Sequence, residues 1–142
     1  MKVVLDTNVL LSAILTPRSP PARLLQLSLE GKFQLLTSPK IMQELVRVIR
    51  YPKLTKLLKK RHLTPKDLDN FLEKLSKIVT WTPGKLTVTA VPEDPADDMV
   101  LACAVEGEAD FIVSGDHHLT ELKTFQGIEI VDPATFLEWL KS

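Results

Sequence analysis

Acidic residues occupy the positions in this sequence that best support chemistry. Asp6 directly follows the apolar run Val3–Leu5, and Asp116 comes shortly after the apolar run Phe111–Val113. Short apolar runs of this kind are typical of buried parallel strands. Because the functional crevice of an open parallel sheet lies beyond the carboxyl ends of its strands, we expect both aspartates at the same edge of a sheet.

Two expected helices bring further acidic residues to this edge. Asp94-Pro95 is a strong helix start, and Asp97 and Asp98 fall in the first turn of that helix. Glu44 falls in the first turns of a helix that starts at Ser38-Pro39. In a strand–helix alternation, helix N-termini face the same rim as the strand ends. The sequence therefore predicts a site made of Asp6, Glu44, Asp98 and Asp116.

A group of carboxylates needs a compensating cation, because the charges otherwise repel and the acids retain their protons. The paired His117-His118 is interpreted as a surface loop, so the expected ligands are the oxygens of Asp6, Asp98 and Asp116. Such a set favours Mg²⁺ or Mn²⁺ over Zn²⁺. A bound ion of this kind lowers the pKa of a water and orients it toward a phosphodiester, which predicts RNA hydrolysis.

The charge distribution predicts where RNA would bind. The formal net charge is zero, but no acidic residue occurs between Leu45 and Lys66. The basic residues of this segment are Arg47, Arg50, Lys53, Lys56, Lys59, Lys60, Arg61 and Lys66. We expect Arg47, Arg50, Lys53 and Lys56 to contact RNA phosphates beside the acidic site. For any single lysine, a solvated helix face is the simpler explanation.

The elements that must position these residues alternate between strand and helix. Strands are expected at 2–5, 33–36, 111–113 and 128–131, with weaker candidates at 79–81 and 86–88. Helices are expected at 8–15, 22–30, 94–107 and 133–140, and others start near 38, 52 and 64. This alternation predicts an α/β fold, a three-layer sandwich with a mainly parallel central sheet.

Composition indicates an ordinary globular protein. The chain has 142 residues, 44% of them hydrophobic and 25% charged, which fits a single domain over residues 1–142. The single cysteine, Cys103, excludes a disulfide within the chain and favours a cytoplasmic location. No signal peptide and no apolar run long enough to cross a membrane are seen.

Several motifs, in the same order along the chain, resemble the PIN-domain family. They are the start at 3–10, the helical glutamate in 41–45, the aspartates and small residues of 97–104, the strand and aspartate of 112–116, and Pro-x-x-Phe-Leu at 133–137. The resemblance implies a Mg²⁺- or Mn²⁺-dependent endoribonuclease, often a dimeric toxin that a small antitoxin protein silences. By position, it assigns the acidic site to Asp6, Glu44, Asp98 and Asp116.

The same resemblance suggests secondary roles near the site. Asn8 is a candidate for a contact to the substrate or to a ligand. Asp98 is preferred over Asp97 because the Leu-Ala step falls three and four residues after it. Thr7 and Ser114 either orient a ligand or satisfy local backbone groups.

Simpler interpretations and other functions remain open at this point. Asp6 alone is also a plausible helix cap, and Asp116 a plausible turn residue. One alternative function is a Mg²⁺-dependent phosphoryl-transfer enzyme that forms an aspartyl phosphate on Asp6. Another is a PIN-like module that binds RNA without cleaving it.

Overall fold

One sheet organises the computed structural model, which describes residues 1–141. Its strands are β1 Lys2–Leu5, β2 Gln34–Thr37, β3 Thr80–Trp81, β4 Phe111–Val113, β5 Thr124–Phe125 and β6 Ile128–Val131. Their order is β3-β2-β1-β4-β6-β5, and within the described residues only β5 is antiparallel to its neighbour. This topology confirms the predicted α/β fold with a mainly parallel sheet.

The helices begin where the sequence places capping residues. They are α1 Thr7–Leu15, α2 Pro20–Leu29, α3 Pro39–Ile49, α4 Pro52–Lys60, α5 Pro65–Ile78, α6 Pro95–Glu106, α7 His117–Thr120 and α8 Pro133–Lys141. Side chains of Ser19, Ser38 and Thr64 cap α2, α3 and α5, and proline stands in the first turn of each.

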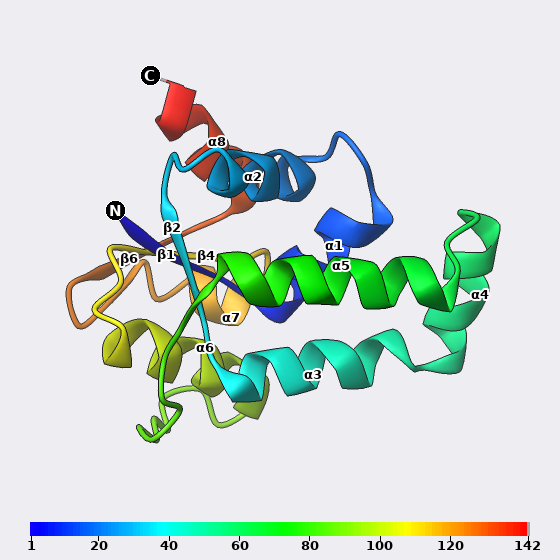
Figure 1. The fold of residues 1–142 in the computed structure, drawn as a ribbon. Helices are drawn as coiled ribbons and strands as arrows, with labels where there is room; N and C mark the ends of the chain where they lie inside the picture. Colours follow the sequence, from blue (N-terminus) through cyan, green and yellow to red (C-terminus); the bar gives the residue numbers. More distant parts are fainter. Residues whose placement is uncertain (142) are drawn as a thin grey trace.

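Helices cover both faces of the sheet and so produce three layers. Figure 1 shows α2 and α8 together on one face and α6 on the other. Phe136 of α8 packs against Phe33 and Phe111, with ring centroids 5.7 and 5.0 Å apart. On the opposite face, Leu101 and Ala104 of α6 are fully buried, as the apolar sequence of this helix predicts.

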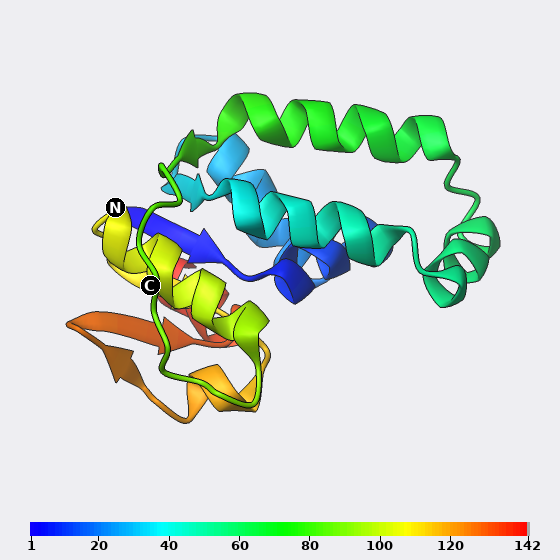
Figure 2. The same cartoon turned by 90° about the horizontal axis from the view of Figure 1, so that it is seen from below.

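Helices α3, α4 and α5 form an arm that extends beyond the carboxyl ends of the strands. Figures 1 and 2 show α3 and α5 running side by side, with α4 at the far end. Ile49 of α3, Leu58 of α4 and Leu72 of α5 line one cavity between the three helices. The basic segment of the sequence lies on this arm, next to the edge of the sheet where the acidic residues were expected.

The irregular segment 82–94 is the main departure from the expected elements. No strand forms at 86–88, because the backbone N–H groups of Gly84, Lys85 and Leu86 donate to the carboxylate of Glu106 instead. The short helix α7 and the edge strand β5 were not expected, since each is too short to show a periodic pattern. None of the helices in residues 1–141 could span a membrane.

Strands β1 and β4 are neighbours at the point where the strand order reverses. From β1 the chain moves to β2 on one side, and β4 later pairs with the other side of β1. Open α/β sheets bind their ligands at such a point, beyond the carboxyl ends of the strands. Leu5 and Val113 pair in the β1–β4 register. The residues that follow them therefore occupy the position where a site is expected.

Candidate active site

Asp6 is buried at the end of β1 and is the N-cap of α1. Its exposed fraction is 3%, and its Oδ1 accepts a hydrogen bond of 2.8 Å from the backbone N–H of Val9. Its Oδ2 accepts a hydrogen bond from the hydroxyl of Ser114, which follows β4. One carboxylate oxygen is therefore held by the first turn of α1 and the other by the residue that follows β4.

Ser114 also fixes Asp116 and so joins two of the predicted acidic residues. The backbone N–H of Asp116 donates to the hydroxyl oxygen of Ser114 at 3.0 Å. Asp116 is the N-cap of α7, and its Oδ1 accepts the backbone N–H of His118 at 2.8 Å. The predicted grouping of Asp6 and Asp116 is present in the structure, and Ser114 positions both.

Helix α6 supplies Asp94 and Asp97 to the same place. Asp94 is the N-cap of α6 and accepts the backbone N–H of Ala96 at 3.1 Å. Asp97, one turn further along, is only 5% exposed. Its Oδ2 is fully buried and has no hydrogen-bond partner within residues 1–141. A buried carboxylate oxygen without a donor is costly, and a bound cation would compensate for it.

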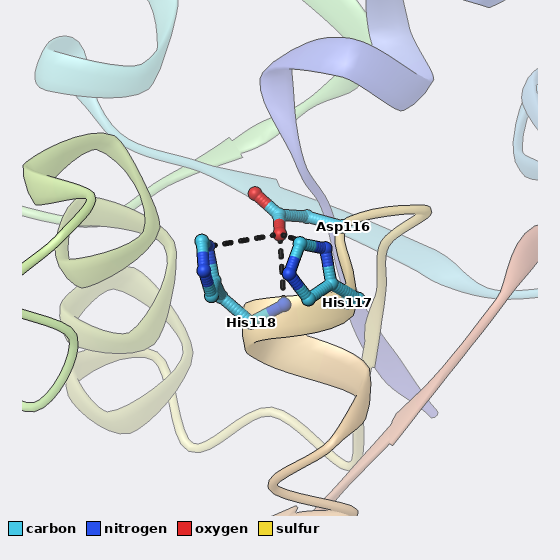
Figure 3. Close-up of side chains that lie close together, drawn as sticks. All are labelled: Asp116, His117 and His118. Carbon is cyan, nitrogen blue, oxygen red and sulfur yellow. Dashed lines mark hydrogen bonds and ion pairs between the residues drawn. The ribbon is translucent and has the colours of Figure 1, made fainter.

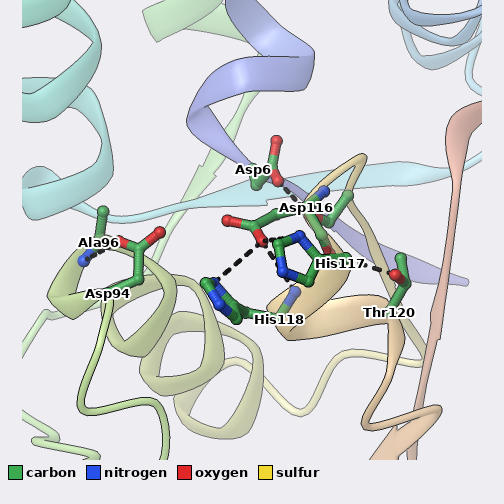
Figure 4. A network of polar contacts seen from close by, with 8 residues as sticks. Asp6, Asp94, Ala96, Asp116, His117, His118 and Thr120 are labelled. Atoms are coloured by element: carbon green, nitrogen blue, oxygen red, sulfur yellow. Dashed lines mark hydrogen bonds and ion pairs between the residues drawn. The ribbon is translucent and has the colours of Figure 1, made fainter.

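Asp94, Asp97, Asp116 and His118 come together as one cluster, called here the Asp–His cluster. One oxygen or nitrogen atom from each of the four residues lies within 4.8 Å of the others. Figure 4 shows Asp94 and Asp116 approaching from the starts of α6 and α7, with Asp6 alongside. In Figure 3 the rings of His117 and His118 lie on different sides of Asp116. Only His118 belongs to the group with Asp94 and Asp97.

The electrostatics of this cluster reflect burial and crowding of like charges. Burial raises the pKa of Asp97 to about 8, and the hydrogen bond and charge of Asp116 add to this rise. Burial also raises the pKa of Asp6 to about 6, although hydrogen bonds from Ser114 and Val9 oppose it. Burial alone would raise the pKa of Asp116, but hydrogen bonds from the His118 backbone and from Asp97 hold it below its usual value. Without a cation, Asp97 therefore keeps its proton to a higher pH than an ordinary aspartate does.

Glu44 reaches the same site from α3. A pocket of about 210 Å³ is lined by Asp6, Glu44, Asp94 and Asp97, together with Thr7 and Asn8. The side chain of Glu44 is 17% exposed and forms an ion pair of 2.7 Å with Arg47. Arg47 also donates to the hydroxyl of Tyr51 at 2.6 Å, and both side chains line a neighbouring groove along α3.

Asp98, which the sequence analysis preferred over Asp97, does not join the cluster. Its Oδ1 accepts the backbone N–H groups of Ala90 and Val91 at 2.9 and 2.8 Å. The carboxylate thus holds the irregular segment before α6 and does not line the acidic pocket. The physical reason is helix geometry, because adjacent residues on a helix point about 100° apart.

Two members of the cluster were not predicted as ligands from the sequence. Asp94 was interpreted as a cap, and it is one, but its carboxylate also faces Asp97 and Asp116. His118 was interpreted as part of a surface loop, whereas it lies at the start of α7 beside Asp116. The Asp94-Pro95 helix start could have predicted the position of Asp94. It places Asp94 at the beginning of α6, and the caps of α1, α6 and α7 meet at this edge of the sheet.

The remaining predicted residues are distributed between the pocket and the arm. Thr7 is buried and Asn8 is exposed, and both line the acidic pocket. Arg50, Lys53 and Lys56 are exposed on α3 and α4. None of these three forms an ion pair with a carboxylate of residues 1–141, so their charges are available to a ligand.

Comparisons with known proteins agree with this architecture. A family model described as "PIN domain" matches residues 2–118. The uncharacterized protein MJ1680 of Methanocaldococcus jannaschii is 35% identical over 123 residues, which cover 87% of this chain and 76% of that protein.

Two solved structures share the fold at low sequence identity. VapBC2 from Rickettsia felis, bound to a DNA fragment from its promoter, gives a TM-score of 0.57 at 16% identity and covers 92% of this chain and 97% of that chain. The PIN domain of human SMG5 gives a TM-score of 0.51 at 13% identity and covers 98% of both chains. Together with the family match over most of its length, this shows that the chain belongs to the PIN-domain family.

Proposed function

We propose that this chain is an endoribonuclease that depends on a divalent metal ion held by Asp6, Asp97 and Asp116. One observation carries the proposal: Asp97, whose Oδ2 is buried without a hydrogen-bond partner in residues 1–141, belongs to one cluster with Asp94 and Asp116. PIN domains are generally nucleases, which supports the same reaction class. The protein needs a cation here because the buried carboxylates repel one another and otherwise retain protons.

The residues of the chain have separable tasks in this proposal. A bound Mg²⁺ or Mn²⁺ would lower the pKa of a water and polarise the phosphodiester. Asp97 and Asp116 would hold the ion, and Ser114 would keep Asp6 and Asp116 in place through its two hydrogen bonds. Asp98 would act indirectly, by fixing the segment that leads into Asp94.

Glu44 and Arg47 form the side of the pocket from which a substrate would enter. Glu44 lines the pocket, and its ion pair holds the guanidinium of Arg47, which lines the neighbouring groove along α3. An arginine in this position can donate to phosphate oxygens in a bidentate manner. Asn8 and Thr7 line the same pocket and offer further polar contacts to a bound strand.

The arm provides a surface suited to a single RNA strand. A groove of about 650 Å³ along α3 is lined by Arg47 and Arg50 and by the exposed rings of Tyr51 and Trp81. Aromatic rings stack on bases, and basic side chains follow the backbone, which is the usual combination for single-stranded nucleic acids. Lys53 and Lys56 extend the positive charge along α4. The strand would thus run from the arm across Arg47 to the acidic pocket.

A toxin role, with a small antitoxin protein as partner and with homodimer formation, is part of the same proposal. The fold shared with VapBC2 of Rickettsia felis supports a partner of this kind. A cytoplasmic location is consistent with a role in RNA cleavage and stays a prediction. Co-expression with the product of a neighbouring small gene, followed by size-exclusion chromatography, would test for the partner.

Two alternatives from the sequence are less well supported by the geometry. An aspartyl phosphate on Asp6 requires a carboxylate that a phosphate donor can reach and attack in line, but Asp6 is only 3% exposed. A module that only binds RNA would have no need for a buried carboxylate cluster, which costs stability without a cation.

The proposal is tested with purified protein and a labelled single-stranded RNA. We expect cleavage with Mn²⁺ or Mg²⁺, loss of cleavage on adding EDTA, and recovery when the metal is returned in excess. Binding of the RNA without cleavage under all metal conditions would contradict the nuclease and favour the RNA-binding module. Cleavage that persists in EDTA would contradict the metal dependence.

A further inference from the structure

We propose that His118 supplies a nitrogen ligand to the metal ion, so that the centre prefers Mn²⁺ over Mg²⁺. This inference rests on the proposed metal-dependent function and specifies the chemistry of its site. It replaces the all-oxygen ligand set expected from the sequence with a mixed set of carboxylates and one imidazole.

The position of His118 carries the inference. A ring nitrogen of His118 lies within 4.8 Å of one carboxylate oxygen from each of Asp94, Asp97 and Asp116. These three oxygens also lie within 4.8 Å of one another. Its Nδ1 is 3.5 Å from Oδ1 of Asp116, and its side chain is 37% exposed. The backbone N–H of His118 donates to the same Asp116 oxygen at 2.8 Å, which fixes the start of α7 against the cluster.

His117 provides a built-in comparison, because it is adjacent in sequence but differently placed. Its side chain is 71% exposed, and its Nδ1 is 3.9 Å from Oδ1 of Asp116. It groups with Asp116 and His118 but does not reach Asp94 or Asp97. Figure 4 shows the ring of His118 on the side of Asp94 and that of His117 on the other side. Only one of the two histidines is therefore placed to bind an ion in the Asp–His cluster.

The buried oxygen of Asp97 is an independent sign that this cluster takes a ligand. That oxygen has no hydrogen-bond partner within residues 1–141, although the residue is 5% exposed. The carboxylate that carries this oxygen belongs to the same cluster as Asp94, Asp116 and His118. Mg²⁺ strongly prefers oxygen ligands and near-ideal octahedral geometry, whereas later divalent ions accept imidazole more readily. A nitrogen in the ligand set therefore disfavours Mg²⁺ relative to Mn²⁺.

Electron paramagnetic resonance of Mn²⁺ tests the inference without relying on activity. Metal-free protein is titrated with Mn²⁺, and the bound ion is then examined by electron spin echo envelope modulation for coupling to ¹⁴N. We expect nitrogen coupling in the wild type and in His117→Ala, and none in His118→Ala. We also expect His118→Ala to weaken Mn²⁺ binding by about 10-fold or more, while Mg²⁺ binding changes less.

A second variant keeps the test decisive if His118→Ala folds poorly by circular dichroism. His118→Asp restores an oxygen ligand, so we expect bound Mn²⁺ without nitrogen coupling and a shift in preference toward Mg²⁺. Nitrogen coupling that survives in His118→Asp, or that is lost in His117→Ala, would overturn the inference. So would Mn²⁺ bound to the wild type without any nitrogen coupling.

These outcomes are distinguishable from failure of the proposed function. If the wild type binds no Mn²⁺, or if Asp97→Asn binds it as tightly as the wild type, the metal centre itself is absent. If Mn²⁺ binds and depends on Asp97 but shows no nitrogen, the carboxylate centre stands and only the role of His118 is removed.

Discussion

Three aspartates of the candidate site are also helix caps. Asp6, Asp94 and Asp116 each accept a backbone N–H at the start of α1, α6 and α7. A cap explains why each residue is an aspartate, and the convergence of three helix starts explains why the carboxylates meet. The positive end of each helix dipole also favours negative charge at these positions. The structural and the functional explanation of these residues are therefore compatible.

The two adjacent aspartates of α6 give the sharpest prediction at the scale of the residue. We expect Asp97→Asn to lower RNA cleavage by at least about 100-fold, since loss of groups that merely support metal ligands already costs 10- to 100-fold. Asp98→Asn keeps an acceptor oxygen for Ala90 and Val91 and should retain most of the activity. Initial rates at saturating Mn²⁺ measure both variants. Equal activity of Asp97→Asn and the wild type, or inactivity of a folded Asp98→Asn, would reverse the assignment.

The sequence was sufficient to locate the acidic edge but not to choose between these neighbours. Asp97 shares a helical stripe with the buried Val100, Leu101 and Ala104, which in retrospect distinguishes it from Asp98. The sequence pattern did not show which face of α6 is buried, because this helix is apolar on nearly all sides. The partners of Asp98 lie in an irregular segment, whose path no periodic pattern predicts.

At the scale of the element, helices α3 to α5 connect the RNA-binding proposal to the site. Helix α3 carries Glu44 at the acidic pocket, and Arg50, which caps the end of α3, lines the groove with Trp81. Helix α4 lies at the far end of the arm and carries Lys53 and Lys56 (Figure 2). The predicted break at Pro52 is confirmed, since α4 starts there, and this break turns the basic helix away from α3.

Charge reversal on α4 tests the arm. We expect Lys53→Glu combined with Lys56→Glu to weaken binding of single-stranded RNA and to reduce the salt dependence of log Kd by about 0.7 for each lost phosphate contact. The control with the same change in net charge is Lys32→Glu combined with Lys141→Glu, since Lys32 precedes the amino end of β2 and Lys141 lies on α8, both away from the arm. Fluorescence anisotropy over a range of salt concentrations, with EDTA present, measures binding alone. An equal loss in the control variant would mean that overall charge, and not the arm, determines binding.

At the scale of the whole molecule, the buried carboxylates link metal binding to stability. The folded chain raises the pKa of Asp97 from 3.8 to about 8 and that of Asp6 to about 6, so the folded state holds protons that the unfolded chain releases. The free energy of unfolding of the metal-free protein should therefore fall as the pH rises from about 4 to about 8. A divalent ion replaces those protons and should restore stability at the upper end.

Urea unfolding at pH 5.5 and pH 8 checks this dependence. We expect the metal-free wild type to be less stable at pH 8, and Asp97→Asn to lose most of the difference because its side chain cannot ionise. Adding Mn²⁺ at pH 8 should raise the midpoint for the wild type and not for Asp97→Asn. A metal-free wild type that gains stability toward pH 8 would show that these acids are ionised in the folded state without a cation.

The position of a bound ion is the most direct test of the account. A crystal of the protein soaked with Mn²⁺ should show an anomalous density peak at about 2.1–2.3 Å from carboxylate oxygens of Asp97 and Asp116, a distance typical of divalent ions. The peak should lie beside Asp6 and away from Asp98. A well-ordered structure that shows no peak at these carboxylates, or a peak elsewhere on the surface only, would contradict the proposed metal centre.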